Sequence, residues 1–304
     1  MTRNESLSLI RSYYDRKTGL IPAGTGLVWY MGQDQLHPPM INNEKFWTSP
    51  EGWKEGAEQT VENLLTLIGT AKNENILDIG SGVGGPGRLA CKEFGLKVIE
   101  LNISRTQLKT NKSLSGGLFN RKYRQTNYLQ GDGQQLPLSR ESIDNAMSIN
   151  MFYHLEKPSW IANELYRTLK PGGKVGIDDW FLTDMTTRDT LEKLRYEWSS
   201  PTGFHKYTDI INIFKKAGFS VEKEVDMTQS GINFINEKFF GSTFDRNIKP
   251  IILKNFARIY GSLDYNPLPE HAEQAANQLK NAVLLMGDLY RNGQASYNQI
   301  VFVK

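Results

Sequence analysis

The stretch ILDIGSGVGG, residues 76–85, decides the fold of this 304-residue chain. A short apolar run contains Asp78, and Gly80, Gly82 and Gly85 follow it with the spacing G-x-G-x-x-G. Glycine at such positions lets the backbone turn tightly between a strand and a helix and approach a ligand closely. Many nucleotide-binding chains share this spacing, so the residues around it must identify the ligand.

Helical and strand patterns alternate on both sides of this turn. Before it, apolar residues recur at helical spacing from Trp53 to Ile68. After it, strand patterns cover 96–103, 126–133, 142–150 and 174–182, with helical patterns at 87–95, 104–114 and 159–169 and a KPGG turn at 170–173. A helix at 207–218, a strand at 219–227, a helix at 271–293 and a final strand at 296–304 follow. The order predicts a doubly wound, mostly parallel α/β sheet.

The same patterns predict four parts of the chain. Residues 1–52 are rich in Tyr and Gly and are expected to form a lid, and 53–227 to form the core. Residues 228–292, rich in Phe, Ile and Asn in their first half, are expected to form a cap inserted before the last core strand at 293–304.

Composition favours small-molecule chemistry. With 36 basic and 33 acidic residues, the net charge of +3 gives no electrostatic case for nucleic acid, and no apolar run is long enough to span a membrane. The single Cys91 excludes an internal disulfide, and the N-terminus lacks the apolar stretch of a signal peptide, so a cytoplasmic location is expected. The four histidines show no metal-ligand spacing, so no metal is expected.

Polar residues at the ends of three strands indicate which ligand the glycine turn holds. A pyrophosphate at a helix N-terminus needs no acid before the turn, whereas the carboxylate of Asp78 suits a cationic group such as the amino group of S-adenosylmethionine. Asn102 ends the second strand, where a ribose hydroxyl would be bound, and Glu100 on the same face is a second candidate for that contact. Asp132 follows the third strand, where a carboxylate can accept a hydrogen bond from adenine.

Four motifs, LDIGSGVGG, ELNISRTQL, GDGQQLP and ELYRTLKPGG, occur in that order, and the chain resembles the class I S-adenosylmethionine-dependent methyltransferases over about residues 53–184. It is most similar to small-molecule enzymes that act on sterols, isoprenoids, glycine or sarcosine, and phosphoethanolamine. The resemblance implies a Rossmann-like sheet of seven strands with the last one antiparallel. It implies S-adenosylmethionine as cofactor, bound by Asp78, Gly80, Gly82, Asn102, Ile103, Gln107, Asp132, Gly133, Gln134 and Asn150.

The segment after the fourth strand holds the candidates for catalysis. Asn150, Tyr153 and His154 lie where the strand leaves the sheet at its ligand-binding edge. The resemblance to phosphoethanolamine-type enzymes implies that His154 assists proton removal; packing is the alternative role. Sterol and isoprenoid enzymes usually carry glutamate at the position of Asn150, and an amide cannot act as a base, which favours a nitrogen or oxygen acceptor. Glu156, Asp178 or Asp179 are alternative acids.

Aromatic residues are the candidates for binding the substrate. Tyr14, Tyr30 and Trp47 lie in the expected lid, and Trp180 follows the fifth strand pattern, where it either walls the pocket or belongs to the core. Aromatic faces there would attract a sulfonium by about 0.5–2 kcal/mol. The apolar cap predicts a sizeable, partly apolar substrate.

The sequence therefore predicts a methyltransferase that acts on a nitrogen or oxygen of a small or medium-sized metabolite or natural product. Two alternatives stay open: methylation of an isoprenoid or prenyl carbon, with or without cyclisation, and a related fold that rearranges or binds a ligand without methylating it. The sequence leaves the oligomeric state open.

Overall fold

A computed structural model describes residues 8, 11, 50–116, 123, 125–198, 203–239, 244–250, 253 and 269–304. Three of the predicted aromatic contacts, Tyr14, Tyr30 and Trp47, lie outside these residues.

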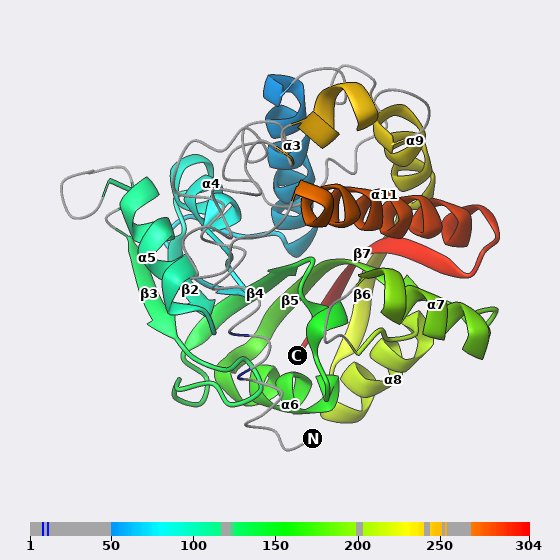
Figure 1. Ribbon diagram of the computed structural model, residues 1–304. Coiled ribbons are helices and arrows are strands. Elements are labelled where there is room, and N and C mark those ends of the chain that lie inside the picture. Colours follow the sequence, from blue (N-terminus) through cyan, green and yellow to red (C-terminus); the bar gives the residue numbers. More distant parts are fainter. Residues whose placement is uncertain are drawn as a thin grey trace.

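One mixed sheet organises the described residues (Figure 1). Its seven strands lie in the order β3-β2-β1-β4-β5-β7-β6, and β7 is antiparallel to both of its neighbours. The strands are β1 Asn75–Ile79, β2 Lys97–Asn102, β3 Thr126–Gln130, β4 Ile143–Ile149, β5 Leu169–Leu182, β6 Ser220–Asp226 and β7 Ala295–Val303. The order reverses between β1 and β4, which is where ligands bind in open α/β sheets.

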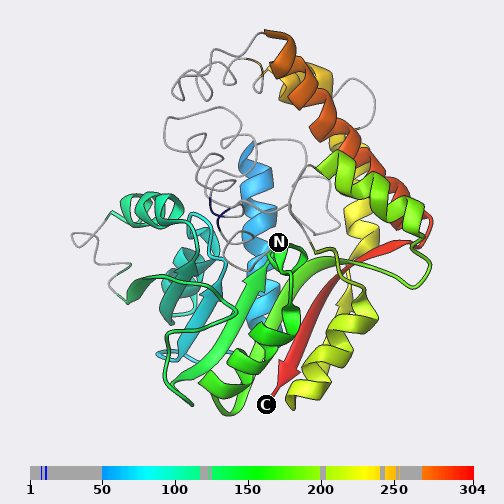
Figure 2. The same ribbon diagram turned by 60° about the horizontal axis from the view of Figure 1, so that its bottom comes forward.

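Helices cover both faces of this sheet (Figure 2). On one face α3 (Pro50–Ile68) and α4 (Gly85–Glu93) bury Val61, Leu64 and Leu89 against β1 and β2. On the other face α6 (Pro158–Thr168) and α8 (Tyr207–Ala217) bury Ile161 and Phe214. Helix α5 (Arg105–Leu114) begins after Ser104, whose hydroxyl accepts a hydrogen bond from the Gln107 amide at 3.1 Å and caps the helix.

A further group of helices lies beside the β5–β7–β6 end of the sheet (Figure 1). Helix α7 (Arg188–Trp198) follows β5, and α9 (Thr228–Phe239), the π-helix η5 (Phe244–Ile248) and α11 (Pro269–Arg291) separate β6 from β7. Their apolar side chains form one cluster with Trp53 of α3, Trp180 of β5 and Tyr297 of β7.

The predicted doubly wound fold with seven strands and an antiparallel last strand is confirmed, and three local predictions need correction. Helices α7 and α9 form in segments for which the sequence predicts no regular element, and each has its apolar residues in the cluster above. Strand β5 begins at Leu169 and therefore includes the predicted KPGG turn. The pairing with β4 moves from Ile143–Leu169 directly to Asn145–Lys174, so the extra residues form a bulge.

Candidate active site

The glycine turn after β1 has a conformation that few other residues adopt. Gly80, Gly82 and Gly84 have φ angles of 75°, 55° and 79°. A Cβ atom on Gly80 would lie 2.4 Å from Cγ of Met151, which follows β4. The backbone of the turn therefore lies directly against the segment that carries the predicted catalytic residues.

Two buried carboxyl groups lie beside this turn. Asp78 of β1 and Glu100 of β2 are partners in the parallel pairing, with exposed fractions of 2% and 0%. Among the described residues, Oδ2 of Asp78 and both carboxyl oxygens of Glu100 are buried without a hydrogen-bond partner. Burial, and then the charge of Glu100, raises the pKa of Asp78 well above its ordinary value, and burial raises the pKa of Glu100 to about 7.

The unpaired carboxyl oxygens show whether the site fits the predicted cofactor. An acceptor buried without a donor costs about 1–3 kcal/mol, so a site that leaves one unpaired is suited to a ligand that brings the donor. The amino group of S-adenosylmethionine is such a donor for Asp78, and its charge favours the ionised carboxylate. The residues at the turn therefore fit the predicted cofactor.

Asn102 is engaged within the protein. Its amide nitrogen donates to Oε1 of Gln107 at 2.9 Å, and its oxygen accepts the Ser104 amide at 2.8 Å. Both Asn102 and Gln107 are buried, and Ile103 between them is half-buried. The structure thus brings together Asn102, predicted at the ribose, with Ile103 and Gln107, two further residues predicted to bind the cofactor. Glu100, the second candidate for the ribose, is buried beside Gly87 of α4.

The loop that carries Asp132 is folded on itself. Oδ1 of Asp132 accepts a hydrogen bond from the Gln134 amide at 2.9 Å, and Oε1 of Gln134 is buried without a partner. A Cβ atom on Gly133, between them, would lie 3.0 Å from Cδ1 of Ile161 of α6. Glycine therefore lets this loop lie against α6.

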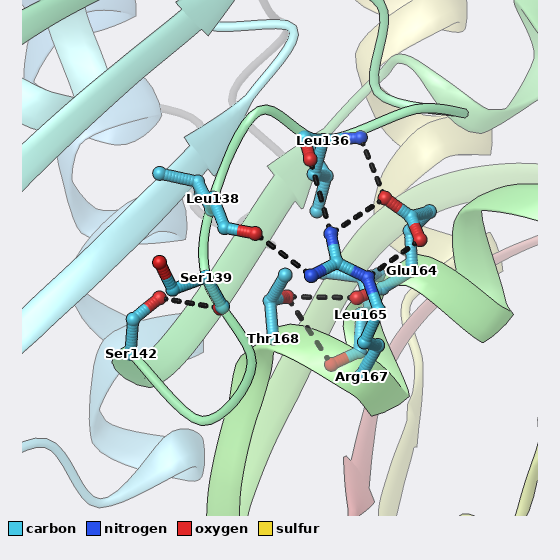
Figure 3. A network of polar contacts seen from close by, with 8 residues as sticks. All are labelled: Leu136, Leu138, Ser139, Ser142, Glu164, Leu165, Arg167 and Thr168. Carbon is cyan, nitrogen blue, oxygen red and sulfur yellow. Dashed lines mark hydrogen bonds and ion pairs between the residues drawn. The ribbon is translucent and has the colours of Figure 1, made fainter.

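An ion pair on α6 forms hydrogen bonds with the backbone of the same loop (Figure 3). The Arg167 guanidinium donates to the carbonyl oxygens of Leu138 and Leu136 at 2.8 and 3.0 Å. The Glu164 carboxylate accepts the Leu136 amide at 2.8 Å and pairs with Arg167 at 2.8 Å. Both side chains are thereby committed to fixing the loop that carries Asp132, Gly133 and Gln134.

Asn150 lies at the end of β4 in a left-handed conformation. Its φ is 50°, which asparagine tolerates better than most residues, and its backbone amide donates to the Asp178 carbonyl at 2.8 Å. Its side-chain nitrogen donates to Oη of Tyr297 at 2.7 Å, and that hydroxyl donates to Oδ2 of Asp178 at 2.8 Å. Three residues from β4, β5 and β7 thus form one hydrogen-bonded chain.

The structure distinguishes the three alternative acids. Glu156 is exposed. Asp179 accepts the Phe152 and Trp180 amides at 2.7 and 2.8 Å, so it fixes backbone, and burial raises its pKa to about 8. Asp178 is hydrogen-bonded to Tyr297, while its Oδ1 is buried with no partner in the described residues, and burial raises its pKa to about 7. Asp178 is therefore the acid linked to Asn150.

Tyr153 and His154 form a 3₁₀ turn, η4 (Phe152–His154), packed on Trp180. The Tyr153 ring centroid lies 3.9 Å from that of His154 and 5.1 Å from that of Trp180. His154 is 7% exposed and Trp180 is 5% exposed. Trp180 also belongs to the apolar cluster with the helices α7, α9 and α11.

Sequence reasoning missed Tyr297, Glu164 and Arg167. Tyr297 lies 147 residues from the asparagine that it contacts, and an alternating strand gives no signal for such a pairing before the topology is known. Glu164 and Arg167 lie three residues apart on one helix, a spacing that favours an ion pair but does not reveal the loop that the pair holds.

Residues 77–177 match the methyltransferase domain family. The sterol 24-C-methyltransferase of Clavispora lusitaniae is 24% identical over 228 residues, which cover 72% of this chain and 56% of that protein. The enzyme of the same name from Aspergillus fumigatus is 26% identical over 236 residues, with 74% and 57% covered. The chain spans about half the length of the curated relatives it matches.

Solved structures with the same fold differ in their chemistry. Geranyl diphosphate C-methyltransferase from Streptomyces coelicolor matches with a TM-score of 0.70 at 12% identity, covering 99% of both chains. Phosphoethanolamine N-methyltransferase 2 from Haemonchus contortus matches with 0.67 at 21%, covering 97% of this chain and 60% of that one. The [4+2]-cyclase SpnF matches with 0.68 at 14%, covering 97% and 94%. At these identities the likeness shows the fold alone.

The fold and the glycine turn define an open α/β domain of the class I methyltransferase type. The chain carries a methyltransferase domain over residues 77–177, which agrees with the predicted enzyme class and its cofactor. Among the described residues, no helix combines the length and the apolar character that crossing a membrane requires. The described residues likewise contain no group of three His, Cys, Asp or Glu side chains placed to hold a metal ion.

Proposed function

We propose that this chain transfers a methyl group from S-adenosylmethionine to a small or medium-sized, partly apolar metabolite. The observation that carries the proposal is that a polar region and an aromatic region lie next to each other at one edge of the sheet. Orphaned carboxyl oxygens lie at the glycine turn, and an aromatic cluster lies beside the segment after β4. The carboxyl oxygens would bind a polar, cationic ligand, and the aromatic cluster would bind an apolar ligand beside it.

When bound, S-adenosylmethionine supplies an electrophilic methyl group on a sulfonium. Asp78 would bind its amino group, and Asn102 with Gln107 would lie at its ribose. The loop at Asp132 and Gln134 would bind its adenine. Transfer by in-line displacement asks the protein mainly for alignment, so rigid supports such as the Glu164–Arg167 pair contribute directly.

The acceptor would lie among aromatic side chains. Tyr153 and Trp180 line the segment after β4, and the Trp180 ring centroid lies 5.3 Å from that of Phe204. Trp53 of α3 packs edge-on against Phe234 of α9, at 4.8 Å between centroids. Helices α9 and α11 would then act as the cap predicted for residues 228–292. These surfaces favour an acceptor with a substantial apolar part.

We favour an alkene carbon as the acceptor atom. The sequence argument for nitrogen or oxygen rests on the absence of an acid at Asn150, but the left-handed backbone there gives asparagine a structural reason. The chain of hydrogen bonds from Asn150 to Asp178 also places an acid two contacts away. Aromatic faces stabilise a carbocation, and the similarity to sterol C-methyltransferases points the same way.

A nitrogen or oxygen acceptor is the second candidate, and His154 supports it. The imidazole lies in the turn at the substrate side, in contact with Tyr153. A neutral imidazole there would accept a proton from the attacking group.

Methyl-deuterated S-adenosylmethionine separates these candidates. The protein is incubated with three acceptor pools, namely prenyl diphosphates and sterol side-chain alkenes, amines, and phenols, and S-adenosylhomocysteine is quantified. NMR of the product then locates the label. A label on carbon supports the first candidate, and a label on nitrogen or oxygen supports the second. Donor binding without S-adenosylhomocysteine in any pool would contradict the methylation and favour a rearrangement catalyst or binding module.

A further inference from the structure

The carboxyl pair under the glycine turn has one member that the proposed reaction does not use. Asp78 has a role at the cofactor's amino group, whereas Glu100 is completely buried one strand away, opposite Asp78 in the pairing of β1 with β2. Within the part of the chain that the structure describes, neither oxygen of Glu100 has a hydrogen-bond partner. A buried acid with unpaired oxygens is costly, so its presence beside the site calls for a physical explanation.

Helix α4 is packed tightly onto this acid. A Cβ atom on Gly87 would lie 2.1 Å from Oε1 of Glu100, so glycine at this position lets the helix lie directly against the carboxyl group. The next residue of α4, Arg88, is buried, and its guanidinium donates hydrogen bonds to the Val83 carbonyl and to Oδ1 of Asn111, both at 2.8 Å. Glu100 is therefore enclosed by protein on the α4 side.

The charges that face the pair do not neutralise it. Within the described part of the chain, Arg88 is the cation that lowers the pKa values of Asp78 and Glu100. Burial, and to a smaller extent the charge of Glu100, raises the pKa of Cys91 of α4 and of Tyr128 of β3. Ser81 and Asn111 are neutral neighbours of the acid.

Two carboxylates and one guanidinium would leave a net negative charge in a buried site. Like charges so close do not both ionise readily, and such a pair retains a proton at a pH where an isolated carboxyl has lost it. The pKa of Glu100 at about 7 and the raised pKa of Asp78 agree with this expectation from geometry.

We propose that Asp78 and Glu100 share one proton in the cofactor-free protein and that binding of the cofactor's ammonium group releases it to solvent. The inference rests on the proposed role of Asp78 at that ammonium. No covalent bond of the cofactor changes: the ammonium donates a hydrogen bond to Asp78, the carboxyl O–H of the pair ionises, and the proton passes to the buffer. Glu100 is thus a positioning residue that acts on the cofactor through Asp78.

The sign of the pH dependence follows from this exchange. Because the cofactor-bound form carries fewer protons than the free form, affinity rises with pH while the free pair is protonated. Release of one proton corresponds to an increase of up to about tenfold in affinity per pH unit. The range from pH 5.5 to 7.5 is suitable, because the α-amino group of the ligand itself stays largely protonated there.

Calorimetry with S-adenosylhomocysteine, which has the same amino group, tests the proposal. Titrations at pH 6.5 in buffers of different ionisation enthalpy give the number of protons released. We expect close to one proton for the wild-type protein and a clearly smaller number for Glu100→Gln. Asp144→Asn is the matched control, because Asp144 lies at the start of β4 and pairs with Lys170; it is expected to match the wild type.

Binding by the wild-type protein without proton release would overturn the proposal and leave the proposed function intact. Absence of any binding would instead contradict the proposed donor site. If Glu100→Gln fails to fold, carbon-13 NMR of the side-chain carboxyl groups decides the matter in the wild type. One Asp or Glu signal must then titrate near neutral pH without ligand and ionise when the ligand is added; a signal that does not move overturns the proposal.

Discussion

The two halves of the site differ in how their buried acids are hydrogen-bonded. On the proposed methyl-donor side (the donor side), formed by β1 to β3, Oδ2 of Asp78 and both carboxyl oxygens of Glu100 have no partner among the described residues. On the proposed methyl-acceptor side (the acceptor side), formed by β4, β5 and β7, Asp179 accepts two backbone amides and Asp178 accepts the Tyr297 hydroxyl through Oδ2, so only Oδ1 of Asp178 has no partner within the described structure. The donor side therefore offers unmet hydrogen-bonding capacity to a ligand of fixed chemistry. On the acceptor side most of these polar groups form hydrogen bonds within the protein, and the neighbouring aromatic side chains would contact the substrate.

The largest expected effect on the acceptor side comes from His154→Ala. If His154 takes a proton from a nitrogen or oxygen acceptor, turnover falls by about 10²–10⁴-fold while cofactor affinity stays unchanged. The wild-type rate then also falls at acid pH, because only a neutral imidazole accepts a proton.

Steady-state rates and product analysis check this prediction. An alkene acceptor attacks without prior deprotonation, so in that case the variant keeps its methyl transfer and releases altered products. A folded variant with the wild-type rate, pH profile and product would assign His154 to packing against Tyr153.

On the donor side the main prediction concerns Asp78→Asn. This change keeps the size of the side chain and removes the charge that would face the cofactor's amino group. Loss of a charged partner costs about 1–3 kcal/mol, so calorimetry should show affinity for S-adenosylhomocysteine reduced by roughly 5–150-fold.

Asp179→Asn is the matched contrast across the site. It removes one acceptor of a backbone amide, so it should lower the unfolding temperature and leave cofactor affinity near that of the wild type. Wild-type affinity in Asp78→Asn would remove the distinction between the two halves.

The same contrast explains how far the sequence predicts the site. The donor side follows from local patterns, because Asp78, Asn102 and Asp132 each end one strand and the glycine turn fixes their common edge. Neighbouring strands in a parallel sheet bring such ends together, so spacing along the chain predicts proximity in space.

The acceptor side depends on contacts across the whole chain. Asn150 and Asp178 are joined through Tyr297, which reaches them only because β7 inserts antiparallel beside β5. The sequence predicts that last strand but not its register with β5. Helices α7 and α9 were not predicted for a related reason: their apolar residues pack on helix α11, which lies far from α7 and α9 in the sequence.

Tyr297→Phe tests the hydrogen-bonded chain on the acceptor side. Removal of the hydroxyl leaves Oδ2 of Asp178 without its donor and Asn150 without its acceptor. We expect a loss of about 1–2 kcal/mol in the free energy of unfolding, because both partners are left unpaired. The pKa of Asp178, which the Tyr297 hydroxyl lowers, should rise further above about 7.

Denaturant titrations and carbon-13 NMR of the carboxyl groups measure these two effects. Tyr290→Phe is the control, since this buried tyrosine of α11 belongs to the same apolar cluster. If Tyr297→Phe lowers the free energy of cofactor binding more than the free energy of unfolding, the hydrogen-bonded chain acts on the cofactor and belongs to the donor side.

The smallest predicted effect is that of Arg167→Lys beneath the donor loop. The guanidinium contacts two carbonyl oxygens and Glu164 together, whereas an ammonium cannot make the same planar set of contacts. The loop with Asp132 and Gln134 should lose rigidity but keep its residues, so cofactor affinity should fall by about two- to fivefold, less than 1 kcal/mol. Arg188→Lys is the matched control, because Arg188 is 88% exposed and pairs only along its own helix with Glu192 within the described structure. Calorimetry with S-adenosylhomocysteine, together with hydrogen exchange of residues 131–138, measures both consequences. Faster exchange in this loop with unchanged affinity would mean that the loop does not bind the adenine, and the donor side would then end at Asn102.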